Sequence, residues 1–155
     1  MSFAVPEGFV DMNEHVEFER TGLARQLRRL GAANAIGPEG KLLYTAVGVM
    51  PVGPAEGMNM SESRCSEMAD QFRGRFQSQV RQMGLKSTAS VKEVHFPGEI
   101  PDTDCEFSVE LGRGEHFAMV IFFEHQETSF LATCEAENFE EAVKLCDDLF
   151  YSWSY

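Results

Sequence analysis

Basic side chains are nearly absent from the last third of the chain. Residues 99–155 hold 14 acidic side chains and only two basic ones, Arg113 and Lys144, so their net charge is -12. Residues 1–98 hold 11 acidic and 11 basic side chains, so the charge of the whole chain arises after them. A surface of this sign repels nucleic acids and attracts basic proteins. The composition therefore favours a protein partner, which includes a second copy of the chain in a homodimer. It excludes nucleic acid as the main partner.

Motifs for metal binding and redox chemistry are also missing. The cysteines are far apart, show no CxxC or CxH pattern and occupy apolar positions of the expected elements. We therefore expect buried free thiols in a reduced, cytoplasmic protein. His116 and His125 flank one expected strand and would lie roughly 30 Å apart, too far to share a metal ion. We expect no metal, no cofactor and no catalytic residue. The four cysteines are Cys65, Cys105, Cys134 and Cys146.

Long hydrophobic runs, internal repeats and a secretory leader are lacking as well. No apolar run approaches the roughly 20 residues of a membrane span. The segment Met1–Pro6 has neither a basic region nor an apolar core of the kind that a signal peptide needs. A length of 155 residues suits one compact domain. We expect a single domain over residues 1–155, in the cytoplasm and without membrane insertion.

Three consecutive strands are predicted in the last third of the chain. Asp104 to Leu111 alternates apolar and polar residues, as a strand does when one face is buried and the other faces solvent. His116 to Glu124 is apolar on both faces, and Thr128 to Glu135 alternates again. The short turns Gly112–Gly114 and Gln126–Glu127 separate the three segments. This pattern predicts an antiparallel meander.

Four earlier segments also show strand patterns. Lys41 to Pro51 is apolar on both faces, which predicts a strand inside the sheet and covered on both sides. Ser87 to Phe96 precedes the meander, and two short strands are expected at Phe3–Val5 and His15–Glu19.

Two long helices and one short helix complete the prediction. Ser61 to Met83 has apolar residues at every third or fourth position and a serine suited to cap it. Asn138 and Glu141 form a capping box at the start of a final helix that runs to Trp153. Thr21 to Gly31 predicts a short helix whose arginines either dock an acidic partner or pair with the chain's own acidic half. Those arginines are Arg25, Arg28 and Arg29.

This order of elements predicts an α+β fold. We expect an α/β/α sandwich with a mainly antiparallel, twisted sheet of about six to seven strands, two long helices and one short N-terminal helix. The two long helices either cover opposite faces of the sheet or pack on one face and leave the other apolar face exposed.

Both ends of the chain resemble a known superfamily. The opening Phe3-Ala4-Val5-Pro6-Glu7-Gly8-Phe9-Val10-Asp11 is similar to the "strand, Pro-x-Gly-aromatic-x-Asp" start of the PsbP, Mog and DcrB-like proteins. Asn138 to Trp153 is similar to the closing helix of that superfamily. The resemblance implies an α/β/α sandwich and a mostly non-enzymatic function. Its members bind a Ran-type GTPase, a photosynthetic complex or the effectors of a secretion system.

These observations predict a non-catalytic cytoplasmic adaptor or chaperone. Its partner would be basic or carry a hydrophobic segment, and would bind an acidic face together with a partly uncovered apolar face of the sheet. Two alternatives stay open, a Ran-type GTPase-binding factor and a hydrolase with a site of histidine and carboxylate groups around His95 or His116. The candidate partner-binding residues are Asp11, Glu106, Glu110, Glu124, Phe117, Met119 and Phe122.

Overall fold

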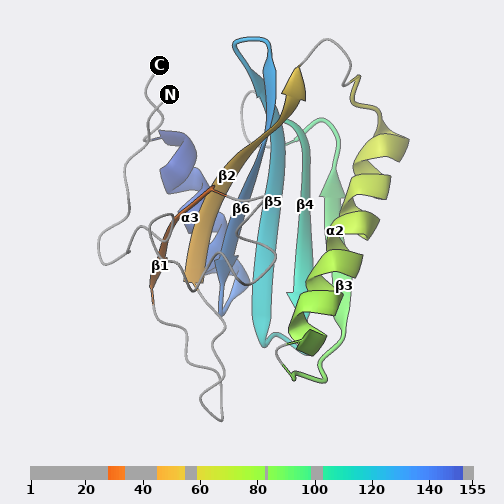
Figure 1. The fold of residues 1–155 in the computed structure, drawn as a ribbon, viewed down its shortest axis with the longest axis vertical. Coiled ribbons are helices and arrows are strands. Elements are labelled where there is room, and N and C mark those ends of the chain that lie inside the picture. Colours follow the sequence, from red (N-terminus) through yellow and green to blue (C-terminus); the bar gives the residue numbers. More distant parts are fainter. Residues whose placement is uncertain (1–27, 34–44, 55–58, 83, 99–102, 152–155) are drawn as a thin grey trace.

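One sheet lies between two helices in the computed structural model, which describes residues 28–33, 45–54, 59–82, 84–98 and 103–151. Figure 1 shows α2 in front of the sheet and α3 behind it. The predicted α+β class is confirmed for these residues. The elements in chain order are β1 (Arg28–Ala33), β2 (Thr45–Pro54), α2 (Glu62–Gln82), β3 (Ala89–His95), β4 (Thr103–Leu111), β5 (His116–His125), β6 (Thr128–Ala136) and α3 (Phe139–Tyr151).

The sheet has six strands in the order β1-β2-β6-β5-β4-β3 over the described part of the chain. Every neighbouring pair is antiparallel. The strands β3 to β6 follow one another across the sheet, so the predicted meander is confirmed. The strand β2 then pairs with the free side of β6 and lies inside the sheet, as its two apolar faces predict.

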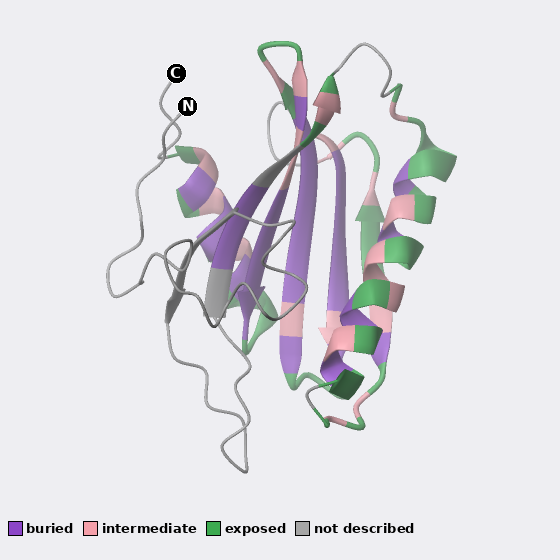
Figure 2. Cartoon of the chain, in the orientation of Figure 1, coloured by how far each residue is buried: buried purple, intermediate pink, exposed green. Residues whose placement is uncertain are grey.

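Side chains of β5 point alternately to the two faces of the sheet, and each face has its own core. Met119 and Ile121 belong to the cluster that contains the buried residues of α3. Val120 and Phe122 belong to the cluster that contains the buried residues of α2. The two helices therefore cover opposite faces, and Figure 2 shows the central strands as the most buried part of the molecule.

The helix α2 is fixed at both ends by side-chain hydrogen bonds. The backbone N–H of Arg64 donates to Ser61 Oγ at 3.2 Å, so Ser61 caps the helix as predicted. Near the other end, the Gln77 side-chain amide donates to the Ser87 carbonyl at 2.9 Å and its oxygen accepts from Ala89 N–H at 2.7 Å. These bonds join α2 to the start of the edge strand β3.

The helix α3 packs on β5 and β6 through a short apolar stripe. Asn138 Oδ1 accepts a hydrogen bond from Glu141 N–H at 2.9 Å, which confirms the predicted cap. The side chains of Ala142, Leu145 and Leu149 are buried against the sheet. A helix of 13 residues is marginal in water on its own, so this contact maintains it.

All four cysteines form disulfides, so the expected free thiols are a wrong prediction. Cys65 of α2 is bonded to Cys105 of β4, and Cys134 of β6 is bonded to Cys146 of α3. Each cysteine occupies a buried, apolar position, as the sequence pattern predicts. Periodicity assigns a residue to a face of its own element, and only the docking of helix on sheet decides which two faces meet.

The prediction of a short helix at Thr21–Gly31 is wrong for its last residues. The residues from Arg28 belong to β1, which pairs with β2 and lies at the sheet edge. Strand pairing here overrides the helical spacing of the leucines. The rest of that segment, and the strands expected at Phe3–Val5 and His15–Glu19, lie outside the described residues.

Replacing Glu127 by glycine should stabilise the fold. The β5–β6 turn has two residues, Gln126 and Glu127, with φ of 46° and 61°, which is the left-handed backbone of a type I′ turn. Glycine adopts this conformation without the cost that a side chain brings, so we expect a gain of about 1 kcal/mol for Glu127→Gly. Denaturant unfolding measures it. The matched control Glu124→Gly lies inside β5 and should destabilise instead; equal effects of both changes would contradict the prediction.

Candidate functional site

A histidine and a glutamate lie together inside the core on the α2 side of the sheet. The register pairs Ala118 with Glu135, which brings Glu135 beside the start of β5 on the face that also holds His116. His116 Nε2 is 3.6 Å from a carboxylate oxygen of Glu135. The His116 ring is fully buried and stacks on the ring of Phe76 of α2 at 6.3 Å. The His116 ring is therefore closed to solvent, while the Glu135 side chain keeps 11% of its surface exposed.

No nucleophile contacts this histidine among the described residues. Neither ring nitrogen of His116 has a hydrogen-bond partner there. The hydroxyls of Ser129 and Thr133 are buried in β6 and also lack a partner. A serine or threonine nucleophile must donate a hydrogen bond to its base before it can attack a substrate. The arrangement lacks that contact and has no exposed reactive atom.

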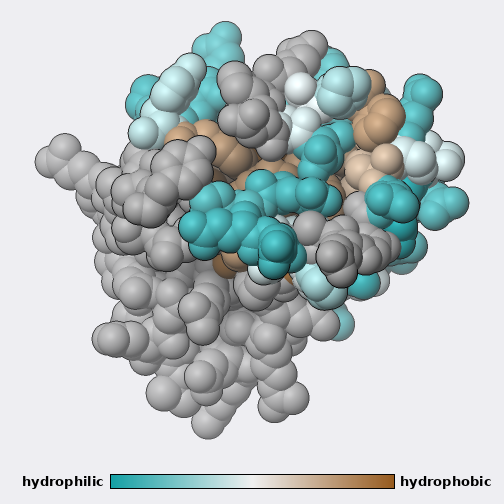
Figure 3. All heavy atoms as spheres, turned by 90° about the horizontal axis from the view of Figure 1, so that it is seen from above, coloured by the Kyte–Doolittle hydropathy of each residue, from teal (hydrophilic) through white to brown (hydrophobic). Residues whose placement is uncertain are grey.

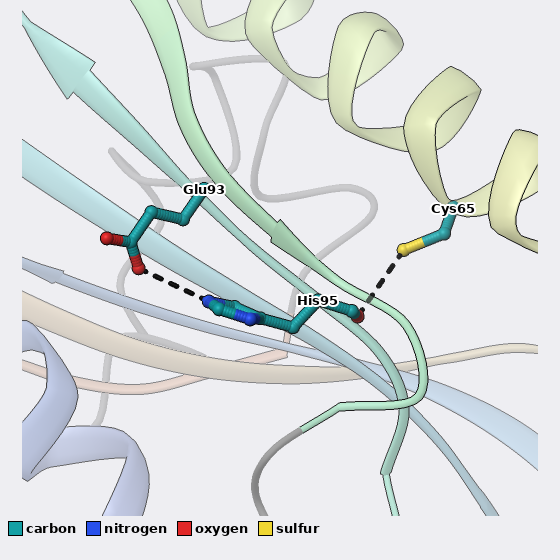
Figure 4. Close-up of polar contacts among 3 residues, drawn as sticks. All are labelled: Cys65, Glu93 and His95. Carbon is teal, nitrogen blue, oxygen red and sulfur yellow. Dashed lines mark hydrogen bonds and ion pairs between the residues drawn. The ribbon is translucent and has the colours of Figure 1, made fainter.

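A second histidine–glutamate pair lies at the end of the edge strand β3. His95 Nε2 is 3.3 Å from a carboxylate oxygen of Glu93, and both side chains are partly exposed. Figure 4 shows the imidazole turned toward Glu93, while the His95 carbonyl oxygen is directed at Cys65 Sγ, 3.8 Å away. No group of three or more histidine, cysteine, aspartate or glutamate residues in the described ranges has the geometry to hold a metal ion.

Acidic groups also meet where β4 begins and β5 ends. Burial raises the pKa of the Asp104 carboxyl above its ordinary value of 3.8, and the negative charge of Glu124 raises it further. Figure 3 views the molecule from the end that carries the β5–β6 turn, and hydrophilic residues there surround a more apolar patch. Burial of the Asp104 carboxyl, more than the like charge of Glu124, disfavours its ionised form at this end of the sheet.

The predicted acidic residues are mostly not on the surface. Glu106 has only 5% of its surface exposed. Lys92 Nζ forms an ion pair with a carboxylate oxygen of Glu110 at 2.6 Å, and the Glu110 side chain is also largely buried. Both side chains lie on the α3 side of the sheet and neither is exposed, so the expectation of a solvent-facing row on β4 is wrong. Glu124 alone of the three is exposed. Asp11 lies outside the described residues.

The predicted apolar residues lie in the two cores. Met119 packs beneath α3 and Phe122 beneath α2, and both are buried. Phe117 is half-buried, with its ring 6.0 Å from that of Phe139 at the start of α3. Because the two helices take opposite faces, these residues do not form the partly uncovered apolar surface that the sequence suggested.

The outer face of α3 carries the charge that the strands do not expose. We define this α3 outer face by its exposed residues and its two terminal aromatic residues. Glu140 and Glu141 lie in the first turn, where the positive end of the helix dipole favours acidic side chains. Asp148 lies near the other end, where the dipole disfavours them, and Lys144 is 3.0 Å from its carboxylate. Its residues are Glu140, Glu141, Lys144, Asp148, Phe139 and Tyr151.

Aromatic side chains are exposed at both ends of this face. Tyr151 has 88% of its surface exposed, and Phe139 has 36%. Twelve helical steps of 1.5 Å separate them, a distance of about 18 Å. The sequence contains a signal for the charged part of this face, since Glu140, Glu141, Lys144 and Asp148 lie off the apolar stripe to which Phe139 belongs. We expected the strands to supply the binding surface.

Comparisons with models of protein families and with curated proteins find no match for this chain. The resemblance to the PsbP, Mog and DcrB-like proteins therefore stays a prediction. Among the described residues, no helix has the length and apolar character needed to cross a membrane.

Replacing Asp104 by asparagine should stabilise the protein at neutral pH. A raised pKa means that the folded state holds the proton more tightly than the unfolded chain does. Stability contributed by Asp104 is therefore present in acid and is lost as the pH rises from 3.8 through the raised pKa. Urea unfolding should show Asp104→Asn to be more stable than the wild type at pH 7, with the difference shrinking toward about pH 4.

Two further variants test the cause of this effect. Glu124→Gln should stabilise less than Asp104→Asn, because burial is the larger cause of the shift. Glu137→Gln removes the same charge from the turn at the far end of β6 and should leave the pH dependence unchanged. An equal response of Glu137→Gln would assign the effect to net charge alone.

Acylation by diethyl pyrocarbonate should spare His116. The reagent needs an accessible imidazole nitrogen, and the His116 ring is fully buried. His95 and His125 are partly exposed and should react in the native protein. Peptide mass mapping after brief treatment gives the order of reaction. Modification of His116 as fast as of His95 would reveal an opening of the core and would revive the hydrolase alternative.

Proposed function

We propose that this protein is a non-catalytic protein-binding module that docks a basic partner on the α3 outer face. The observation that carries the proposal is the position of acidic side chains at both ends of α3. Acids in the first turn stabilise a helix, whereas Asp147 and Asp148 near its end oppose the helix dipole. The ion pair with Lys144 offsets part of this cost for Asp148 but not for Asp147. Attraction of a positively charged partner would account for the acids at this end of the helix.

The electrostatic part of the interaction follows from the distribution of charge. From Glu137 to Tyr151 there are five acidic residues and one lysine, a net charge of -4, and Lys144 is paired with Asp148. Charges at the rim of an interface raise the association rate and the specificity for a partner more than they raise the affinity. Binding should therefore weaken as salt rises, since the Debye length shrinks to about 8 Å at physiological ionic strength.

The exposed aromatic residues supply the contacts that hold the partner. Tyrosine is enriched among the few interface residues that carry most of the binding energy. Tyr151 and Phe139 lie about 18 Å apart along the helix axis, and Phe139 lies on the side of the helix where its ring also contacts Phe117. A partner segment that crosses the helix obliquely would reach both. We expect a basic segment with apolar or cationic side chains spaced to meet the two rings.

The other functions suggested by the sequence have less support. A chaperone that shields hydrophobic segments would need exposed apolar side chains on the sheet, and the predicted candidates Met119 and Phe122 are buried. Binding of a Ran-type GTPase or of a secretion effector stays a prediction from the resemblance. A homodimer through the α3 outer face would bring two acidic surfaces together. The predicted cytoplasmic location has lost its argument, because that argument rested on free thiols and all four cysteines are disulfide-bonded.

Charge reversal on α3 tests the proposal. The double variant Glu140→Lys/Asp148→Lys changes one acid at each end of the helix, so its effects on the helix dipole oppose each other and the fold should persist. We expect capture of the main partner from a lysate of the protein's own cells to fall by about tenfold or more. Quantitative mass spectrometry of the captured proteins at low and physiological salt gives the measurement.

The matched control reverses two acids on the opposite side of the sheet. Glu67→Lys/Asp70→Lys changes the net charge by the same amount on the exposed side of α2. This variant should capture the partner as the wild type does. An equal loss of partner capture in both variants would show that net charge alone causes the effect. If the wild type captured no stoichiometric partner at low salt, the proposal would be overturned.

A further inference from the structure

Each disulfide fastens one helix to one face of the sheet. Cys65–Cys105 joins α2 to β4, and Cys134–Cys146 joins β6 to α3. The strands β4 and β6 are the two neighbours of β5, so the crosslinks flank the most apolar strand on its two sides. All four cysteines have no exposed surface.

The fold permits only one pairing of the four cysteines. Four cysteines allow three pairings in principle. Cys65 and Cys105 lie in the core under α2, whereas Cys134 and Cys146 lie in the core under α3. The sheet separates these two cores, so any exchanged pairing would have to cross it. The Cα atoms of both bonded pairs are 5.7 Å apart, within the range of a disulfide.

The surroundings of the sulfurs are those of structural crosslinks. Catalytic and redox-sensing cysteines are exposed, and many occur in CxxC motifs or near positive charge. Here the bonded cysteines are 40 and 12 residues apart. Cys65 Sγ lies against the His95 carbonyl oxygen, an electronegative neighbour that disfavours a thiolate (Figure 4). A thiol reductant reaches these bonds only when a helix leaves the sheet.

We infer that the protein folds by thiol oxidation and works in a compartment that keeps disulfides oxidised. In each pair, two thiols give up two protons and two electrons to a disulfide oxidant, which leaves as two thiols. Such an oxidant has the chemistry of a thiol–disulfide oxidoreductase or of an oxidised small thiol. Stable buried disulfides are common in oxidising compartments and rare where thiol reductants dominate. This inference does not depend on the proposed docking surface.

Trapping the thiols in the cell gives the direct test. Cells that make the protein at its natural level are quenched in acid, and the denatured protein is then alkylated with N-ethylmaleimide. We expect no alkylated cysteine in the intact protein by mass spectrometry. A non-reduced digest should contain the peptides of Cys65 and Cys105 joined, and those of Cys134 and Cys146 joined. Four alkylated thiols in the trapped protein would overturn the inference, and so would an exchanged pairing.

Thermal unfolding of the purified protein tests the structural role. Reductant should act slowly on the native protein and rapidly in denaturant, because the sulfurs are buried. Full reduction should lower Tm by about 10 °C or more for each bond lost. An unchanged Tm after verified reduction would show that the crosslinks do not maintain the fold.

Serine variants separate the two crosslinks. Cys134→Ser/Cys146→Ser should lower Tm and leave a further fall on reduction, because Cys65–Cys105 remains. Cys65→Ser/Cys105→Ser should give the converse result. Should either variant fail to fold, the thiol trap on the wild-type protein still decides between oxidised and free cysteines.

Discussion

The two apolar faces of β5 set the conditions for the rest of the fold. A strand with Ile121 on one side and Phe122 on the other is stable in water only when both sides are covered. One helix cannot cover both, so α2 and α3 must take opposite faces. Each fully buried large side chain contributes roughly 1.5–3 kcal/mol. A total stability of about 5–15 kcal/mol depends on a handful of such residues, which leaves little tolerance for an undocked helix.

Each helix makes a narrow contact with the sheet, and the disulfides compensate for it. The helix α3 has three buried side chains besides Cys146, and α2 covers β3 and β4 at one end of the sheet. Closing a loop by a disulfide removes entropy from the unfolded chain, by about 3–4 kcal/mol at separations like these. The two bonds together therefore equal a large part of the stability expected for a domain of this size. Placed on the two strands that flank β5, they act at the sites where an opened helix would expose the most apolar surface.

Local pattern predicted the elements well and their mutual positions poorly. The strand and helix patterns from Ser61 onward agree with the structure to within one or two residues at the described ends, since each depends on periodicity within its own segment. The pairing of Cys134 with Cys146, the burial of Glu106 and the covering of Phe122 depend instead on which face meets which helix. That choice arises from packing between segments far apart in the chain. The prediction of the acidic surface failed for the same reason. We expected the acidic side chains of β4 to be exposed, whereas the exposed acidic side chains lie on α3.

The demands of the core also determine where function can lie. Both sheet faces are occupied by helices, and the two histidine–glutamate pairs are either sealed or offer no third ligand among the described residues. Among the described residues, exposed charged side chains lie on the outer surfaces of the two helices, on the edge strand β3 and in the turns. The helix α2 spreads both signs of charge along its length, whereas α3 has acids even where its own dipole disfavours them. The Lys144–Asp148 ion pair offsets part of that cost, and the proposed docking of a basic partner would give the remaining acids a role. In the proposed docking, the disulfide of α3 would have a second effect, because a helix fastened to the sheet loses less entropy when a partner binds.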